Sequence, residues 1–229
     1  MPKTRVPLLA LLTLLAPALA AAGEEKHDTR DKKTVRTLDA RFTTGGVELV
    51  ELEFPVGRLI VAGHQSRELV VKVDLACEAA KSRSCQDAAR QVRLVGRIDD
   101  ERLRVELEDW PRVGARGLQA YARVHVPRLL PLHCELGVGE LKVSGMEGNV
   151  AIDLGVGEVH VTMPEHAVGS VQLDVGVGEA DLLTAHGRQS GKGWVAKELH
   201  WRKGKGESTV RVDCGVGEIN VALVGGKPE

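Results

Sequence analysis

The chain has 229 residues with nearly equal numbers of basic and acidic residues, 31 and 32, and a formal net charge of −1. Without a basic excess there is no electrostatic reason to expect nucleic acid as a partner. Aromatic residues make up only 3% of the chain, so we expect a core of small aliphatic side chains in thin stacked sheets.

Residues 1–22 have the layout of a cleaved secretory signal. A basic start at Lys3 and Arg5 precedes an apolar run that ends in small residues, with Ala18 and Ala20 at the positions that a signal peptidase reads. The alternative, a membrane anchor, needs roughly 20 apolar residues, and Pro17 interrupts this run. No cysteine follows that could carry a lipid. We therefore expect a periplasmic, secreted or cell-surface protein with no stable membrane insertion after cleavage.

Residues 23–41 are highly charged, and we interpret them as a flexible lead-in. Residues 42–224 are expected to form one β domain, followed by a tail at 225–229. Short runs with period-two alternation or β-branched residues predict strands, and an alanine-rich interruption at 77–92 predicts a short helical insertion. The predicted strands cover residues 47–54, 59–61, 69–73, 92–95, 103–107 and 121–126.

The chain has four cysteines, and an exported protein meets an oxidising environment in which disulfides can form. Cys77 and Cys85 bracket a short loop, so we expect them to form a disulfide that pins the helical insertion. Cys134 and Cys214 fall at inward positions of distant strands. They form either a second disulfide or two buried thiols that pack as small hydrophobic residues.

The second half of the chain contains an internal repeat, which outranks local propensity as evidence of architecture. Four strings share the pattern apolar–acid–apolar, Gly-Val-Gly-Glu, apolar–x–apolar, and an earlier, altered copy runs from Leu52 to Val61. The step before the last copy is about twice as long as the others. It leaves room either for a degenerate coil near residues 191–195 or for a hairpin insertion. The four strings are 134–143, 152–161, 173–182 and 212–221.

The flanks of each string alternate with period two, so each flank is a short strand with one buried face. Two glycines around a single valine predict a bend that needs positive φ or close backbone approach. The sequence therefore predicts an all-β, single-domain β-solenoid of stacked short strands with Gly-x-Gly corners. Leu136, Leu154, Val175 and Cys214 would form one inward column, and Val138, Val156, Val177 and Val216 would lie at the corner.

The acids of the repeat are expected to form two outward columns. Within each column, acids on neighbouring strands would lie about 4.8 Å apart. Like charges at that spacing repel by roughly 0.9 kcal/mol per pair in water. Either backbone N–H groups at the corner and solvent offset this repulsion, or a bridging divalent cation or basic partner does. The cation ladder would consist of Glu140, Glu158, Glu179 and Glu218, and the other column of Glu135, Asp153, Asp174 and Asp213.

The sequence offers no candidate catalytic residue. None of the eight histidines belongs to a His-Glu-x-x-His motif, and His160 replaces a position that is Lys, Asp or Asn in the other copies. The carboxylates come in ladders rather than as one pair in contrasting environments. The Gly-x-Gly strings precede strands, so no helix N-terminus is available for a phosphate. We expect no enzyme, no cofactor and no resident metal beyond the ladder.

Two of the three tryptophans lie beside cations, in a stretch that includes Trp194, Trp201, Arg202 and Lys203. These residues either form an exposed platform for a glycan or an envelope polyanion, or the tryptophans plug the solenoid while the cations are solvated. The first interpretation makes them a candidate partner surface.

At these repeats the chain resembles the bacterial putative-adhesin family of β-solenoid domains, also called toast-rack domains. The resemblance covers roughly residues 42–224, with an opening strand at 54–61 and a Trp-containing stretch at 201–207 before the last repeat. It differs from the usual Gly-Ser-Gly-Asp string by using Val and Glu. The resemblance implies a β-solenoid and adhesion, without assigning a binding residue.

The sequence is compatible with three functions. The first is an exported, non-catalytic envelope protein that acts as an adhesin-like interaction module on an unknown envelope protein or glycan. The alternative is a periplasmic regulatory or envelope-stress module that holds a partner, or a second copy of itself, through an exposed edge such as Ile219 to Val224. A polysaccharide-active β-helix enzyme is the third.

Overall fold

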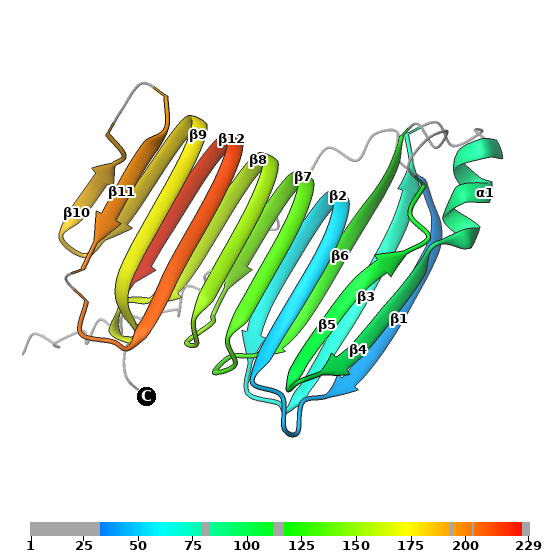
Figure 1. Ribbon diagram of the computed structural model, residues 1–229, viewed down its shortest axis with the longest axis horizontal. Helices are drawn as coiled ribbons and strands as arrows, with labels where there is room; N and C mark the ends of the chain where they lie inside the picture. Colours follow the sequence, from blue (N-terminus) through cyan, green and yellow to red (C-terminus); the bar gives the residue numbers. More distant parts are fainter. Residues whose placement is uncertain (1–32, 79–82, 112–116, 193–194, 203, 226–229) are drawn as a thin grey trace, which may run out of the picture. The chain divides into compact units, whose positions relative to one another are not determined.

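The computed structural model describes residues 33–78, 83–111, 117–192, 195–202 and 204–225, and the expected signal segment and tail lie outside them. The described part of the chain is all-β, with twelve strands in one sheet system and one short helix (Figure 1). The helix α1 spans Arg83–Gln91 and a 3-10 turn spans Glu165–Ala167. The strands are β1 (Lys33–Thr43), β2 (Leu49–His64), β3 (Glu68–Cys77), β4 (Arg93–Asp99), β5 (Arg102–Glu108), β6 (Leu118–Pro127), β7 (Leu132–Ser144), β8 (Val150–Pro164), β9 (Val168–Thr184), β10 (Gly187–Ser190), β11 (Lys197–Trp201) and β12 (Ser208–Val224).

The four Gly-Val-Gly-Glu strings lie in the middle of the four long strands β7, β8, β12 and β9. These strands pair in parallel and in register, so that each string lies directly beside its equivalent. Gly139 pairs with Gly157, and Gly157 with Gly217. The earlier, altered copy of the string, on β2, extends the stack, since Gly57 pairs with Gly139. The predicted solenoid of stacked strands with Gly-x-Gly corners is confirmed.

Each long strand changes its buried face at its corner, and β2, at one end of the repeat stack, also changes one of its partners there. The first half of β2 pairs with β5, whereas its second half pairs with β6. Leu136 and Leu141 lie on opposite sides of the β7 corner, five positions apart, and both are buried. Since side chains alternate along a strand, an odd separation between two inward residues requires the backbone to turn between them. The two halves thereby close over one aliphatic core.

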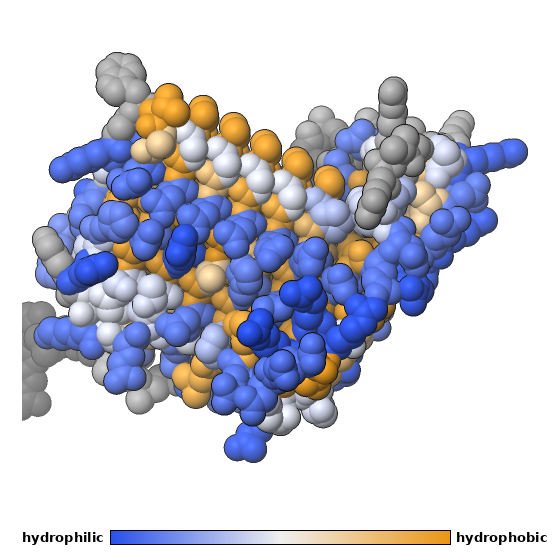
Figure 2. Space-filling model, viewed as in Figure 1, coloured by the Kyte–Doolittle hydropathy of each residue, from blue (hydrophilic) through white to orange (hydrophobic). Residues whose placement is uncertain are grey.

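The corner valines point outward. Val138, Val156, Val177 and Val216 are between 47 and 53% exposed, and Figure 2 shows a continuous row of apolar side chains along the upper edge of the stack. Because the strands are in register, these four side chains form a ridge with a spacing of about 4.8 Å. We call this set the valine ridge.

The spatial order of the repeat strands differs from their order along the chain. The last repeat strand, β12, inserts between β8 and β9 rather than stacking beyond β9. After β9 the chain returns antiparallel along it as β10 and β11, so the hairpin alternative for the long step is confirmed. The prediction that Ile219 to Val224 forms a free edge is wrong, because Ile219 pairs with both Val159 and Ala180.

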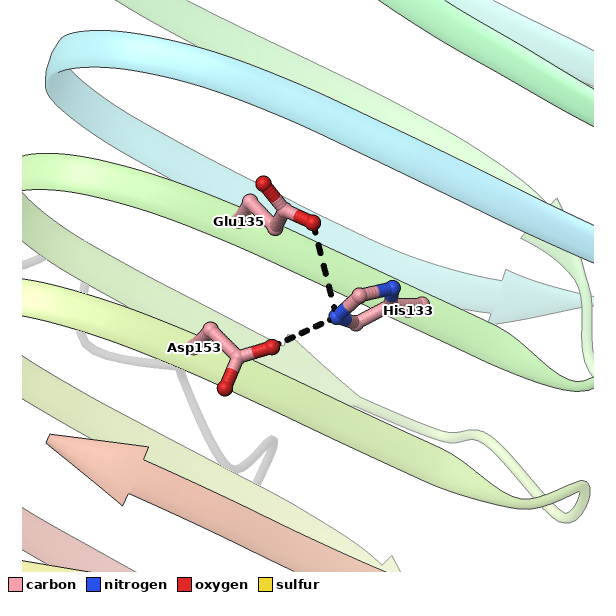
Figure 3. A group of neighbouring side chains, drawn as sticks. All are labelled: His133, Glu135 and Asp153. Carbon is pink, nitrogen blue, oxygen red and sulfur yellow. Dashed lines mark hydrogen bonds and ion pairs between the residues drawn. The ribbon is translucent and has the colours of Figure 1, made fainter.

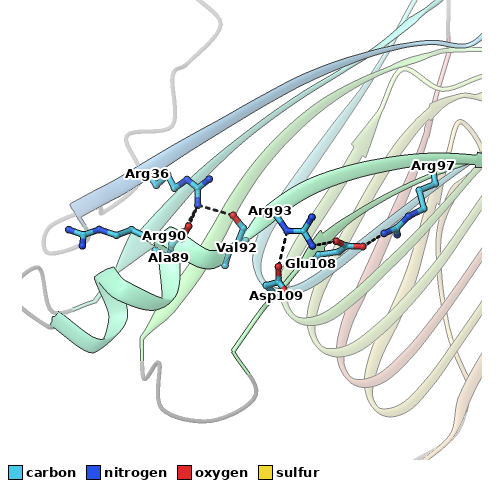
Figure 4. A network of polar contacts seen from close by, with 8 residues as sticks. All are labelled: Arg36, Ala89, Arg90, Val92, Arg93, Arg97, Glu108 and Asp109. Atoms are coloured by element: carbon cyan, nitrogen blue, oxygen red, sulfur yellow. Dashed lines mark hydrogen bonds and ion pairs between the residues drawn. The ribbon is translucent and has the colours of Figure 1, made fainter.

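Residues 33–41 of the expected flexible lead-in belong to a strand, so that part of the prediction is wrong. The strand β1 pairs antiparallel with β3 along its whole length. Its apolar positions Leu38, Ala40 and Phe42 alternate with charged ones, and the charges mask this period in the sequence. Arg36 also donates from one nitrogen to the carbonyl oxygens of Ala89, at 3.0 Å, and Val92, at 2.8 Å (Figure 4).

The helical insertion and its disulfide are as predicted. Cys77, at the end of β3, is bonded to Cys85 in α1. Cys134 and Cys214 are free and buried, which resolves their two alternatives in favour of thiols. None of the helices in the described ranges is long and apolar enough to cross a membrane.

Candidate functional site

One column of carboxylates runs across seven neighbouring strands on the first-half side of the corner. The strand register places each acid beside the next, from β5 through β2, β7, β8, β12 and β9 to β11. We call this set the acidic column. It consists of Glu106, Glu53, Glu135, Asp153, Asp213, Asp174 and Glu198. The four central members are those that the sequence predicted, in a different order.

A groove of about 940 Å³ runs alongside the acidic column, and all seven of its carboxylates line it. Its floor follows the residues that start each corner, which are Pro55 and four glycines. Those glycines are Gly137, Gly155, Gly215 and Gly176.

The floor is low because the floor glycines can carry no side chain. A Cβ atom on Gly155 would lie 2.4 Å from the carbonyl oxygen of Gly137 on the next strand, well inside contact distance. The residue that follows each floor glycine in the chain is a member of the valine ridge. The glycines therefore create a strip of bare backbone that lies between a line of carboxylates and the residues of an apolar ridge.

The β5 end of the groove is closed by Glu106, Leu107 and Trp110. The neighbouring strand β4 holds this wall in place (Figure 4). Arg93 forms ion pairs with Glu108 at 2.6 Å and with Asp109, next to Trp110, at 2.8 Å. Arg97 pairs with Glu106 at 2.5 Å. Ion pairs from two arginines of β4 thus hold β5 and the residues just after it, which form this wall.

The opposite end is closed by Ala196, Lys197 and Glu198 from the start of β11. The backbone N–H of Ala196 donates to the carbonyl oxygen of Gly176 at 2.8 Å. This bond fixes the end wall to the floor itself. The groove is therefore bounded at both ends by segments outside the repeat.

Some of the acidic column is already engaged by neighbours. Arg211 donates to Asp213 at 2.8 Å and Gln172 to Asp174 at 2.9 Å. The other cations near the column are Arg97 on Glu106, Lys197 at the end wall and Arg104, whose charge acts on Glu53 and Glu106. Seven carboxylates against four cations leave the groove with an excess of negative charge. At Asp213 and Asp174 a neighbouring side chain donates the hydrogen bond that was expected from a backbone N–H group at the corner.

Two histidines lie beside the acidic column. The Nε2 atom of His133 is 2.7 Å from an oxygen of Asp153 and 3.9 Å from one of Glu135 (Figure 3). At the other end, Nε2 of His200 is 3.8 Å from an oxygen of Glu198, and Asp174 completes a second set. Within the described ranges, these are the two sets of three side chains close enough to hold a metal ion.

The second acidic column lies on the other side of the corner, in the spatial order Glu140, Glu158, Glu218, Glu179. Glu140 forms ion pairs with Arg58 at 2.5 Å and Lys142 at 2.9 Å. Burial raises the pKa of Glu140, but the hydrogen bond from Lys142 and the charges of Arg58 and Lys142 outweigh it, so the pKa lies below its ordinary value. The structure brings the four predicted ladder residues together, and the cation itself stays a prediction.

The predicted partner surface around Trp201 is wrong for that residue. Trp201 ends β11, is 4% exposed and belongs to the core, so the plug interpretation is confirmed for it. Arg202 is exposed. Trp194 and Lys203 lie outside the described residues, so their part of that prediction stays open.

The sequence alone missed the groove and the histidine sets. Glu106, Trp110 and Glu198 lie outside the repeat, and only pairing of β5 and β11 brings them to it. The set around His133 did have a signal. His133 and Glu135 are two apart on one strand face, and Asp153 is the repeat equivalent of Glu135.

No family model and no curated protein matches this chain. Among solved structures, a putative cell adhesion protein from Clostridium sporogenes is similar, with 19% identity, a TM-score of 0.51, and coverage of 82% of this chain and 99% of that one. A putative adhesin from Parabacteroides merdae matches with 8% identity, a TM-score of 0.28, and 81% of each chain covered. The first similarity confirms the fold that the family resemblance implied.

Proposed function

We propose that this protein is an exported, non-catalytic binding module of the cell envelope that captures an extended, positively charged chain segment in its groove. The observation that carries the proposal is the acidic column, which lines the groove from one end wall to the other. The likeness to a structure described as a cell adhesion protein supports the adhesive role.

Charge complementarity selects the ligand. A row of carboxylates in a partly enclosed groove focuses the negative potential and attracts cations. The valine ridge follows the floor glycines in the chain, so the aliphatic stems of lysine or arginine have apolar surface to lie on while their charged heads reach the carboxylates. Trp110 at the β5 end offers an aromatic face to a guanidinium or ammonium group.

The dimensions of the groove favour an extended chain. Seven strands at about 4.8 Å spacing give a column about 29 Å long. An extended peptide rises about 3.3 Å per residue, so about nine residues span the column. The glycine floor, which lacks side chains, lets the ligand's backbone approach closely.

Binding rather than catalysis suits the chemistry of the groove. The carboxylates repeat in similar environments along one line, whereas acid–base catalysis requires titratable groups whose surroundings push their pKa values apart. Both cysteine residues of the repeat are buried, and burial raises the pKa of the thiol of Cys214, the one that lies along the groove. The side chains facing the groove therefore offer charge and shape rather than an activated nucleophile.

A matched pair of variants tests the proposal. The probe is a fluorescein-labelled peptide of about ten residues that alternates lysine and serine, with fluorescence anisotropy as the readout. We expect the triple variant D153N/D213N/D174N to weaken binding about tenfold or more, because it removes three groove charges. The control E158Q/E218Q/E179Q removes three charges from the same strands on the other side of the corner and should bind like the wild type.

Equal loss of affinity in both variants would reduce the effect to net charge and contradict the groove as the site. Export is tested separately, by N-terminal sequencing of the protein recovered from periplasmic and culture fractions. We expect a new N-terminus near residue 23. Unprocessed chain retained in the cytoplasm would contradict the envelope location without affecting the binding result.

A further inference from the structure

We propose that His133, Glu135 and Asp153 form a binding site for a divalent transition metal, with zinc as the preferred ion. The Nε2 atom of His133 lies between the two carboxylates, 2.7 Å from Asp153 and 3.9 Å from Glu135 (Figure 3). All three side chains offer a ligand atom within 4.8 Å of the other two. Glu135 and Asp153 also belong to the acidic column, so a bound ion would occupy part of the groove, but zinc binding is measured separately from peptide binding and either can fail alone.

The sheet holds these three side chains in place. His133 and Glu135 are two residues apart on β7 and therefore project from the same face. Asp153 on β8 is the direct register partner of Glu135. The backbone ladder consequently fixes three Cα positions, and only side-chain rotation is needed to close the set around an ion.

The distances fit a small ion after minor adjustment. Zinc binds histidine nitrogen and carboxylate oxygen at about 2.0–2.2 Å, which places tetrahedral ligands about 3.4 Å apart. The separations of 2.7 and 3.9 Å from Nε2 bracket that value. One imidazole and two carboxylates leave a fourth position for water, as in zinc sites with three protein ligands.

The surrounding charges favour an incoming cation. Glu53 and Asp213 continue the acidic column on either side of the set, and like charges at this spacing repel one another. A divalent ion would neutralise both ligand carboxylates. Arg211 on the Asp213 side is bonded to Asp213, and its charge acts more weakly on Asp153.

The same donor set recurs at the other end of the column. Asp174, Glu198 and His200 also place one ligand atom each within 4.8 Å. His133 and His200 occupy the same register row, linked through Ala151, Arg211 and Gln172. That row spans four strand steps, about 19 Å, so the two sets would hold separate ions.

Isothermal titration of the purified protein with zinc chloride tests the site. We expect two zinc ions per chain in the wild type, one after H133A and one after H200A. D153N keeps a hydrogen-bonding partner for His133 but removes a ligand charge, and should weaken that site at least tenfold. The matched control is H160A, because His160 faces one carboxylate, Glu158, at 3.5 Å.

A second readout separates ligation from stability. The ¹⁵N resonance of His133 Nε2 should shift on adding zinc, and the thermal midpoint of metal-free H133A should equal that of the wild type. Unchanged stoichiometry and affinity in H133A would overturn the proposal. So would an equal loss in H160A, because that result would mark zinc binding as general to surface histidines.

Discussion

The carbonyl oxygen of Gly139 lies 1.8 Å from the point where a Cβ atom on residue 157 would stand. Gly157 also has a φ of +140°, a conformation that residues with side chains rarely adopt. Two independent requirements therefore demand glycine at this corner, and the register repeats them on each neighbouring strand.

We expect Gly157→Ala to destabilise the protein by about 3–5 kcal/mol, because the clash is with backbone that cannot move without breaking the ladder. Chemical unfolding measures the effect. Gly45→Ala is the control, since nothing lies within 4 Å of its Cβ position. A cost below about 1 kcal/mol at residue 157 would mean that the corners are not stacked closely.

Trp201 is expected to act through packing. Trp201→Ala should cost about 3–5 kcal/mol, as is usual when a large buried aromatic side chain is truncated. Arg202→Ala, at the exposed neighbouring position, should change stability by less than about 0.5 kcal/mol. Loss of binding to glycans in Trp201→Ala with full stability would contradict this role.

The ion pairs of Glu140 predict a pH-dependent contribution to stability. Glu140 is only 19% exposed beside Arg58, so Glu140→Gln should cost about 1–3 kcal/mol at pH 7. A carboxyl whose pKa is depressed in the folded state stabilises above its unfolded pKa, about 4.3, and loses that effect as pH falls through the folded pKa.

The difference in unfolding free energy between wild type and Glu140→Gln should thus be constant from pH 7 to about pH 5 and shrink below that. Glu158→Gln is the control, because that side chain is 59% exposed and faces a histidine at 3.5 Å. A difference that grows on acidification would show that the ion pairs are not what stabilises Glu140.

The two free cysteines should be unreactive in the folded protein. Cys134 and Cys214 are buried, and burial raises the pKa of both thiols, so little thiolate forms near neutral pH. Titration with Ellman's reagent should find no reactive thiol in the native state, two in denaturant, and four after reduction of the Cys77–Cys85 bond. Rapid native reaction would contradict the burial of the repeat strands.

The solenoid and its acidic columns could be predicted because each depends on local chemistry. The glycine at position 157 indicates a corner where the backbone conformation excludes a side chain. Period-two alternation then places Leu154 inward and Asp153 outward, whichever strands lie on either side. The neighbours of β12 could not be predicted. All four strings present nearly the same edge, so the pattern does not say whether Cys214 lies beside Val175 alone or between Val175 and Leu154, as it does.

The groove could not be predicted from the sequence, for a different reason. Its end walls come from β5 and β11, which share no pattern with the repeat and reach it only through pairing of Glu106 with Glu53 and of Glu198 with Asp174. Trp110 gave no periodic signal at all. Sequence patterns describe a repeated unit well, whereas a site bounded by what interrupts the repeat depends on tertiary structure.

The most direct test of the proposed cation-binding groove is a titration of ¹⁵N-glycine-labelled protein with the lysine–serine peptide, followed by NMR. The account predicts that the amide resonances of the floor glycines Gly137, Gly155, Gly176 and Gly215 shift together, saturate with one affinity, and return on adding salt. Binding that leaves these four resonances unchanged while shifting glycines elsewhere, such as Gly45 or Gly225, would contradict it.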